Sequence, residues 1–274
     1  MTFQLQAICV QHPEAQQVLA LQDITLSIQA GEQLALIGPS GAGKTSLLHT
    51  LACAIQPTLG NMHAFETEPW KVKNKERHQL RSRLFLAPQT PPLPPRQRVI
   101  NAVLAGKLPQ WSTWKALCSL IKPAEPLLAY EALSHFHLQE KLYARVDRLS
   151  GGERQRCSMA RALVSNAEAF LMDEPLSALD PVLAIQTLNV LQTEARQRQA
   201  VLVCSLHQVE LARQYFPRII GLCHGRIVFD ESSNNVTDEM IASLYKMGNQ
   251  QQIMPSPPSE PSHTLKANSV ISRC

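Results

Sequence analysis

One stretch of eight residues, Gly38-Pro-Ser-Gly-Ala-Gly-Lys-Thr45, narrows the choice of folds more than any other part of this 274-residue chain. It follows an uncharged apolar run, Leu34–Ile37, and precedes a helical pattern over Ser46–Ala54. Glycines let a backbone wrap so that successive N–H groups face an anion, and the helix that follows directs its positive N-terminal end at the same anion. The stretch therefore predicts a phosphate-binding loop between a strand and a helix.

The residues of this loop have separate predicted roles. Lys44 is expected to reach the β- and γ-phosphates of a nucleotide, and the Thr45 hydroxyl is expected to coordinate Mg²⁺. A plain glycine turn is the alternative, which the preceding strand and the following helix disfavour. The residues predicted to contact the phosphates are Gly38, Pro39, Ser40, Gly41, Ala42, Gly43, Lys44, Thr45 and Ser46.

Short apolar runs alternate with helical patterns along the rest of the chain. The expected elements are strands at Ala169–Met172, Ala200–Cys204, Ile219–Leu222 and Arg226–Phe229 and a helix at Pro181–Gln197. Such alternation predicts a mostly parallel sheet with helices on both faces. Ligands bind such sheets beyond the carboxyl ends of the strands, so functional residues are expected directly after each strand.

Two adjacent acids, Asp173 and Glu174, end one of these predicted strands. Side chains of neighbouring strand residues point to opposite sides, so the two acids need not share a role. Asp173 is suited to the Mg²⁺ shell, acting through water, and Glu174 is placed to polarise the water that attacks the γ-phosphate. An isolated Asp-Glu pair is often a solvated turn, but the phosphate loop favours the functional interpretation.

A second glycine-containing segment, Leu149-Ser-Gly-Gly-Glu153, opens another helix about 105 residues after the phosphate loop. Ser150 is a plausible N-cap, and a helix N-terminus with free N–H groups is also an anion site, so both roles can hold. The Asp-Glu pair follows about 20 residues later. This combination resembles the ATP-binding-cassette (ABC) ATPases, in which L-S-G-G-[EQ] is the family signature.

The resemblance implies the fold and its division. The fold is α/β, a P-loop (RecA-like) nucleotide-binding core with a mostly parallel sheet, an antiparallel β part and an inserted α-helical subdomain. The ABC domain is expected over residues 1–247, with the helical subdomain at about 87–160. Residues 248–274 are rich in Pro and Ser and have little to bury, which predicts a disordered tail.

The resemblance also implies roles for residues outside the two glycine segments. Gln89 matches the Q-loop glutamine, which contacts Mg²⁺ and the attacking water. His207 matches the switch histidine that contacts the γ-phosphate, and Asp180 matches the D-loop residue that helps join two sites. In this family the signature loop of one subunit, here Ser150, Gly151 and Gly152, closes on the ATP of its partner. The expected unit is a head-to-tail dimer of two copies with two ATP molecules.

Two features depart from the family pattern. The family usually has an aromatic residue near the N-terminus that stacks on adenine, whereas Cys9-Val-Gln-His-Pro13 contains no Tyr, Phe or Trp. His12 is the nearest flat ring, and whether it or another group stacks on adenine stays open. Gln89 lies in a proline-rich run, Pro88–Pro95, in which fixed φ angles and missing donors are expected to stiffen the loop.

Within the family, the chain is most similar to ATP-binding subunits of phosphonate importers. The stretches that carry this similarity are Asn101–Gly106 with Trp111 and Trp114, Leu206–Ala212, Arg218–Leu222 and Gly225–Phe229. The resemblance implies two membrane permease subunits and an external solute-binding protein as partners. Phosphonate, phosphite or a related oxyanion is the expected solute, and an importer cassette for another solute is the alternative.

Composition adds the location and the redox state. No run approaches the roughly 18 apolar residues of a membrane helix, and the start lacks a secretory leader pattern. These absences predict a protein that stays in the cytosol, and the resemblance implies a peripheral position on the cytoplasmic face of the inner membrane, held by the permease. Seven scattered cysteines predict reduced, buried thiols. Among Trp111, Trp114, Leu117 and Leu120, a minority is expected to contact the partner.

A soluble ABC ATPase that acts on nucleic acid or ribosomes is the rival hypothesis. The basic run Lys71–Arg77 could contact nucleic acid, although a solvated helix face is the commoner reason for such a run. A single cassette, a net charge of +4 and the lack of sustained heptads disfavour this rival, so no nucleic acid partner is expected. A phosphate-binding regulator without turnover is disfavoured by Glu174, Gln89 and His207.

Overall fold

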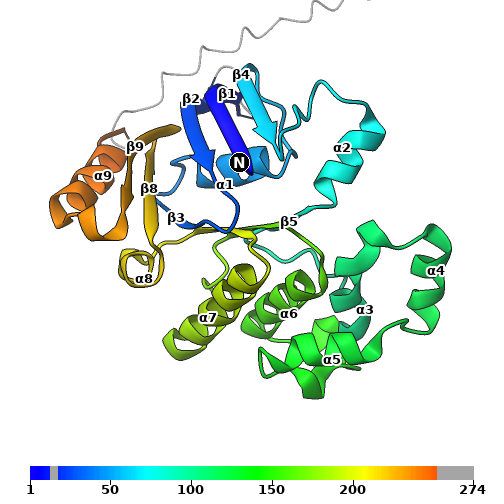
Figure 1. Cartoon of the computed structure of the whole chain (residues 1–274). Helices are drawn as coiled ribbons and strands as arrows, with labels where there is room; N and C mark the ends of the chain where they lie inside the picture. The colour runs from blue at the N-terminus through cyan, green and yellow to red at the C-terminus, as the bar shows by residue number, and fades with distance from the viewer. Residues whose placement is uncertain (13–17, 252–274) are drawn as a thin grey trace, which may run out of the picture.

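Two β-sheets form the centre of the molecule, which we describe from a computed structural model that covers residues 1–12 and 18–251 (Figure 1). The larger sheet has the strand order β5-β6-β7-β3-β8-β9, and every neighbouring pair is parallel except β8 and β9. Its strands are β5 (Leu84–Ala87), β6 (Ala169–Asp173), β7 (Val201–Ser205), β3 (Gln33–Ile37), β8 (Arg218–Cys223) and β9 (Arg226–Ser232). The smaller sheet is antiparallel, with the order β2 (Leu19–Ile28), β1 (Phe3–Gln11) and β4 (Leu59–Ala64).

Helices follow most of the strands. They are α1 (Lys44–Leu51), α2 (Asn74–Arg81), α3 (Val99–Leu104), α4 (Thr113–Ile121), α5 (Pro126–Ser134), α6 (Gly151–Val164), α7 (Pro181–Gln197), α8 (Val209–Tyr215) and α9 (Asp238–Gln251). The α/β fold with a mostly parallel sheet, an antiparallel part and added helices is the one predicted from the sequence. Within the part of the chain that the structure describes, no helix is both long and apolar enough to span a membrane.

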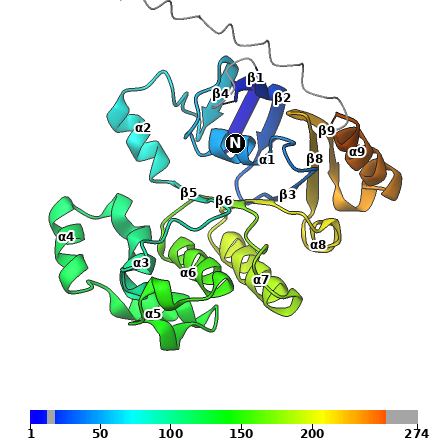
Figure 2. The ribbon, with the colours of Figure 1, turned by 180° about the vertical axis from the view of Figure 1, so that it is seen from behind.

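Each face of the larger sheet borders its own apolar core. Along β3, Ala35 and Ile37 face one core, and the alternate residues Leu34 and Leu36 face the other. The first core is covered by helices, including α6 and α7 (Figures 1 and 2). The second is covered by α1 and the antiparallel sheet. Helices therefore lie on both faces, as predicted, and on the second face the antiparallel sheet covers much of the area beside α1.

The helices α3 to α6 gather at the β5 side of the molecule (Figure 2). They lie close to the predicted helical subdomain of residues 87–160, but the first of them begins at Val99 and α6 continues to Val164. The intervening proline-rich residues 88–98 contain no helix or strand apart from an isolated bridge at Arg98. Proline at several consecutive positions removes the N–H donors that a helix needs.

One face of α4 is apolar and exposed. Trp114 is 75% exposed and Ile121 is 90% exposed, and Leu117 and Leu120 are also exposed, whereas Trp111 packs partly against the core. Three of the four residues named from the sequence, Trp114, Leu117 and Leu120, are thus exposed, and which of them contact a partner stays a prediction. The helix lies at the outer edge of the helical group (Figure 2).

The last helix, α9, lies against the phosphate-binding loop. It runs to Gln251, so the predicted domain boundary after residue 247 falls inside it. Gly248 is buried, and a Cβ atom added there would lie 2.4 Å from Cγ of Pro39. The predicted tail beyond this helix, residues 252–274, lies outside the described residues.

Arg218 joins the N-terminal end of β8 to three other segments. Its Nε and Nη2 atoms donate to the two carboxylate oxygens of Asp230 at 2.7 and 2.6 Å. Its Nη1 atom donates to Glu32 Oε1 at 2.7 Å and to the Ser27 carbonyl at 3.0 Å. These bonds connect the two sheets, because Ser27 belongs to β2 and Asp230 to β9.

Most described cysteines behave as small apolar residues. Cys53, Cys157, Cys204 and Cys223 are buried free thiols, as predicted, and burial raises the pKa of Cys53 and of Cys157 to about 12. Among the described cysteines the exceptions are Cys118, which is exposed on α4, and Cys9, which is half-buried on β1. Cys274 lies outside the described residues.

Some of the charged side chains in the basic run around α2 contact neighbouring residues of the same segment. Lys71 Nζ forms an ion pair with Glu68 at 2.6 Å, and the Arg77 guanidinium lies 4.9 Å from the centre of the Trp70 ring. These contacts fit the solvated helix face that the sequence favoured over nucleic acid binding.

Candidate functional site

The glycine loop connects the carboxyl end of β3 to α1, and its backbone requires glycine. Gly38, Gly41 and Gly43 have φ angles of +148°, +75° and +103°, which side chains rarely adopt. A Cβ atom at Gly38 would lie 2.1 Å from the Leu222 carbonyl oxygen. The loop is therefore fixed against β8 and presents its backbone at the carboxyl edge of the sheet, where the sequence predicted a phosphate site.

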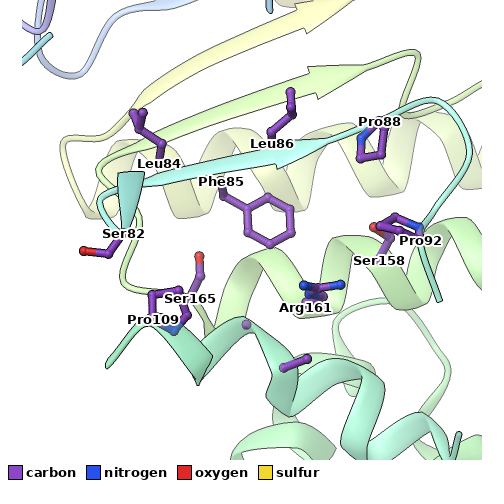
Figure 3. Close-up of a pocket in the computed structure, with 12 residues that line it drawn as sticks. Ser82, Leu84, Phe85, Leu86, Pro88, Pro92, Pro109, Ser158, Arg161 and Ser165 are labelled. Atoms are coloured by element: carbon purple, nitrogen blue, oxygen red, sulfur yellow. The ribbon is translucent and has the colours of Figure 1, made fainter. Parts of the chain in front are cut away.

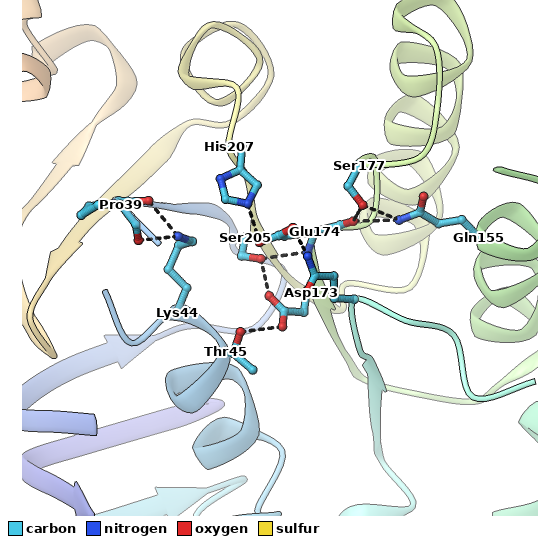
Figure 4. Close-up of polar contacts among 11 residues, drawn as sticks. Pro39, Lys44, Thr45, Gln155, Asp173, Glu174, Ser177, Ser205 and His207 are labelled. Carbon is cyan, nitrogen blue, oxygen red and sulfur yellow. Dashed lines mark hydrogen bonds and ion pairs between the residues drawn. The ribbon is translucent and has the colours of Figure 1, made fainter. Parts of the chain in front are cut away.

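Lys44 lies inside this loop. Its Nζ atom donates to the carbonyl oxygens of Gly38 and Pro39 at 2.7 and 3.0 Å (Figure 4). Burial lowers the pKa of the Lys44 ammonium, and the charges of Glu174 and Asp173 oppose that effect. The ammonium is thus held among loop oxygens with two carboxylates near enough to favour its charged form.

Asp173 ends β6 and is hydrogen-bonded through both carboxylate oxygens. Oδ2 accepts from the Thr45 hydroxyl at 2.8 Å, and Oδ1 accepts from the Ser205 hydroxyl at 2.6 Å (Figure 4). The structure thus brings together two of the three residues that the sequence predicted for Mg²⁺, Thr45 and Asp173, whereas the amide of the third, Gln89, bonds to Glu174. Ser205 did not follow from any motif; the only sequence signal for it is its place as a polar residue directly after an apolar strand run.

The second acid, Glu174, points toward different partners. Its Oε2 atom accepts from Gln89 Nε2 at 2.6 Å, and its Oε1 atom lies 2.5 Å from His207 Nε2. Its side chain is only 14% exposed. Three residues that the sequence assigned to catalysis, from segments after β5, β6 and β7, therefore meet at one carboxylate.

The signature segment forms the start of α6. The Glu153 N–H donates to Ser150 Oγ at 3.2 Å, and the Ser150 N–H donates to Glu153 Oε2 at 2.7 Å, which is a capping box. The hydrogen bond from the Ser150 N–H lowers the pKa of the Glu153 carboxyl. A Cβ at Gly151 would meet open space, whereas one at Gly152 would lie 2.8 Å from the Ala178 carbonyl oxygen. The side-chain bonds of Ser150 thus close within its own cap and do not reach the phosphate loop.

Asp180 caps the next helix. Its Oδ1 atom accepts from the backbone N–H groups of Val182 and Leu183 at 3.1 and 3.0 Å at the start of α7. The residue is exposed, so the cap is compatible with the predicted role at a contact between two copies.

His12 is the ring considered for adenine. It donates its backbone N–H to the Val18 carbonyl, and the residues between them, 13–17, lie outside the described part.

Solved structures share this fold. A dimeric structure of a bacterial ABC transporter cassette superposes with a TM-score of 0.74 at 23% identity, covering 85% of this chain and 100% of that chain. A dimeric structure of a post-hydrolysis state of an ATP-binding cassette bound to ADP and Pi superposes with a TM-score of 0.70 at 24% identity, with the same coverages. At these identities the likeness establishes the fold alone.

Sequence comparison identifies the family. A family described as ABC transporter matches residues 21–177. The chain is 53% identical over 247 residues to the phosphonates import ATP-binding protein PhnC 2 of Albidiferax ferrireducens, covering 89% of each chain. It is 48% identical over 261 residues to PhnC 2 of Pseudomonas aeruginosa, covering 95% of this chain and 97% of that protein. The chain belongs to the ABC transporter family, as one of its ATP-binding subunits.

Proposed function

We propose that this chain is the ATP-hydrolysing subunit of an ABC importer for phosphonates, with phosphite or a related oxyanion as the nearest alternatives. The proposal that the chain hydrolyses ATP rests on one observation. Gln89 and His207 both contact the Glu174 carboxylate, which lies near Lys44 in its glycine loop. The solute rests on the similarity to phosphonate import proteins over about nine-tenths of the chain.

The loop and Lys44 bind the triphosphate in this proposal. Phosphate oxygens can replace the carbonyl oxygens of Gly38 and Pro39 as acceptors for the Lys44 ammonium. The Thr45 hydroxyl, the Asp173 carboxylate and the Gln89 amide supply oxygen atoms suited to Mg²⁺. Among the described residues, no group of three or more His, Cys, Asp and Glu side chains could hold a metal by itself. That donor set fits a cation held partly by phosphates and water, which neutralises charge on the phosphate oxygens.

Glu174 acts on the water in the hydrolytic step. Its carboxylate accepts a hydrogen bond from the water that attacks the γ-phosphorus while the bond to the bridging oxygen of ADP breaks. His207 and Gln89 hold the carboxylate through one oxygen each, so its orientation is fixed before the substrate arrives. Ser205 and Thr45 hold Asp173 in the same way on the metal side.

A second copy completes the site. The N-terminal end of α6 carries Ser150, Gly151 and Gly152, and Gly151 has open space around it. Backbone N–H groups at a helix start attract anions, so this edge is suited to the γ-phosphate held by the partner. Asp180 lies exposed at the start of α7, where it can join the two sites. ATP binds the closed dimer better than the open one, which shifts the attached permease between states.

A pocket between β5 and α6 supports the docking of a permease segment (Figure 3). Phe85, Pro88 and Arg161 are among the side chains that line it, and Arg161 Nε is buried without a hydrogen-bond partner. A carbonyl or carboxylate from an inserted segment would satisfy that donor. Pro88 directly precedes Gln89, so an occupant of this pocket would sit beside the hydrolytic residues. The chain is then a peripheral subunit on the cytoplasmic face of the inner membrane, and an external solute-binding protein delivers the solute to the permease.

Replacing Glu174 by Gln tests hydrolysis. We expect Glu174→Gln to keep ATP affinity, to lower turnover by roughly 100-fold or more, and to accumulate an ATP-bound dimer visible by size-exclusion chromatography. Glu168→Gln, at the opposite end of the same strand, is the matched control and should retain turnover, because Glu168 pairs with Arg83 instead. Normal turnover in Glu174→Gln would remove Glu174 from the chemistry.

The same variant tests transport. A strain that lacks this subunit should regain uptake of radiolabelled phosphonate when the wild-type chain is supplied, and should not regain it with Glu174→Gln. Phosphite and phosphate are measured in parallel. If the wild-type chain restores uptake of phosphite or phosphate but not of phosphonate, the restored compound is the solute in place of phosphonate. If it restores uptake of none of the three, the chain does not serve an oxyanion importer.

A further inference from the structure

Gln155 is a buried polar residue that no motif singled out. It lies in α6 just after the Ser150–Gly152 segment, and its side chain is 3% exposed. Burying an amide is costly unless its donors and acceptor are used. Its partners therefore show what the residue does.

Among the described residues, the partners of the Gln155 amide all lie in the segment that follows Asp173. Nε2 donates to the Glu174 carbonyl oxygen at 2.8 Å and lies 3.4 Å from Ser177 Oγ. Oε1 accepts from the Ala178 N–H at 3.0 Å. A single side chain of α6 thus holds both ends of the turn from Glu174 to Ala178, and its contacts with Glu174 and Ser177 are drawn in Figure 4.

The turn needs such support because of its backbone. Glu174 has φ +48°, in the left-handed region that residues with a Cβ seldom occupy. Its N–H donates to Ser205 Oγ at 2.8 Å, and its carbonyl oxygen accepts from Gln155 and, at 3.1 Å, from the Ser177 hydroxyl. Side chains of β7 and α6 therefore fix the two peptide groups that flank the Glu174 Cα atom, and so fix the direction of its carboxylate.

We propose that Gln155 is a positioning residue for ATP hydrolysis, which holds the Glu174 backbone of its own chain in the conformation that aims the carboxylate at the attacking water. This inference rests on the proposed function, since it assumes that Glu174 serves hydrolysis. Gln155 makes no hydrogen bond to the phosphate loop, so it has no part in binding ATP.

Two substitutions separate positioning from binding. Gln155→Met removes every hydrogen bond of the amide, and Gln155→Glu keeps an acceptor for the Ala178 N–H but loses the donor to Glu174. Both variants should lower kcat roughly 10- to 100-fold, because small displacements of a reacting group have effects of this size. The dissociation constant for ATP, measured by titration, should stay within about twofold of wild type, since Lys44 and Thr45 keep their contacts.

Gln192 provides a matched control. It is also a buried glutamine, 4% exposed, and its Nε2 atom donates to the Tyr215 carbonyl oxygen at 2.6 Å, in α7 and remote from Glu174. Gln192→Met loses the same kind of bond and should leave kcat unchanged. Equal loss of ATP affinity and kcat in the Gln155 variants, or an equal loss of kcat in Gln192→Met, would mark a general packing role and overturn the proposal. If Gln155→Met fails to fold, the same measurements on Gln155→Glu test the proposal.

Mixed dimers show on which chain Gln155 acts. A chain with Lys44→Ala cannot bind its own ATP, so its dimer with a wild-type chain has one working site. Adding Gln155→Met to the chain that binds ATP should lower kcat, whereas adding it to the Lys44→Ala chain should not. Loss only in the second arrangement, or equal loss in both, would contradict the proposal.

The Glu174→Gln measurement separates this inference from the proposed function. If Glu174→Gln retains turnover, the proposed function fails. If Glu174→Gln abolishes turnover while Gln155→Met and Gln155→Glu keep it, the inference about Gln155 fails and the proposed function stands.

Discussion

At the scale of single residues, the unusual feature is that the catalytic candidate has a strained backbone. The left-handed conformation of Glu174 costs free energy that a glycine there would not pay. Ser205 and Gln155 hold the peptide groups on either side of it. Ser205 and Gln155 therefore set the direction of the carboxylate through the backbone, in addition to the bonds that His207 and Gln89 make to its oxygens.

Substitution can separate the capping role of Ser150 from its proposed role toward the partner's ATP. Ser150→Asp should keep the free energy of unfolding within about 0.5 kcal/mol of wild type, because Asp caps helices as well as Ser, whereas Ser150→Ala should lose about 1 kcal/mol. The added carboxylate would face the triphosphate of the partner and repel it, so Ser150→Asp should abolish ATP-dependent dimerisation in the Glu174→Gln background. Thermal unfolding and size-exclusion chromatography measure the two effects, and an undiminished dimer in Ser150→Asp would contradict the proposed role of this edge.

Sequence could predict those site residues that carry a contiguous motif or a family position. Lys44 and Thr45 are adjacent in one motif, and the turn between β3 and α1 places them without help from distant segments. Ser205 and Gln155 lie 31 and 19 residues from Glu174, and only the pairing of β6 with β7 and the packing of α6 bring them there. A single serine or glutamine gives no pattern from which that proximity could be read.

At the scale of elements, the contact of α9 with the phosphate loop gives a prediction against helix propensity. Gly248→Ala should favour the helix by up to about 1 kcal/mol in isolation. Its Cβ would collide with the Pro39 ring, so the loop must shift, and the KM for ATP should rise several-fold. Lys246→Ala, an exposed position in the same helix, is the control and should leave KM unchanged. A KM for Gly248→Ala equal to wild type would show that the loop tolerates the shift.

The contact between Gly248 and Pro39 bears on where a truncated form of the chain should end. A truncation that begins at Gly248 follows the boundary predicted from composition, yet it removes the last residues of α9 together with the Pro39 contact. Composition could not reveal this, because the final turn of α9 contains glycine and glutamine, which are typical of a linker. By contrast, buried strands such as β3 and the helix α7 were predicted with bounds close to those observed, since apolar runs and capping residues mark them clearly.

At the scale of the whole molecule, the Arg218 guanidinium is one of the links between the two sheets. Arg218→Met should lower the free energy of unfolding by about 1–3 kcal/mol, because it leaves Glu32 and Asp230 without their shared partner. Urea denaturation measures this change, and the KM for ATP should stay near wild type because the residue lies at the opposite end of β8 from the phosphate loop. Arg226→Met, which loses one exposed bond to Gln22, is the control. Equal stability of the two variants would show that the Arg218 bridge contributes little.

The apolar surface of α4 has a practical consequence for anyone who purifies this chain alone. In the isolated chain the side chains of Trp114 and Ile121 are exposed to water. Because exposed apolar surface favours association, separate copies should aggregate through α4 and precipitate. Co-expression with the permease, or a charged side chain introduced at residue 121, is therefore the expected route to a preparation concentrated enough for crystals.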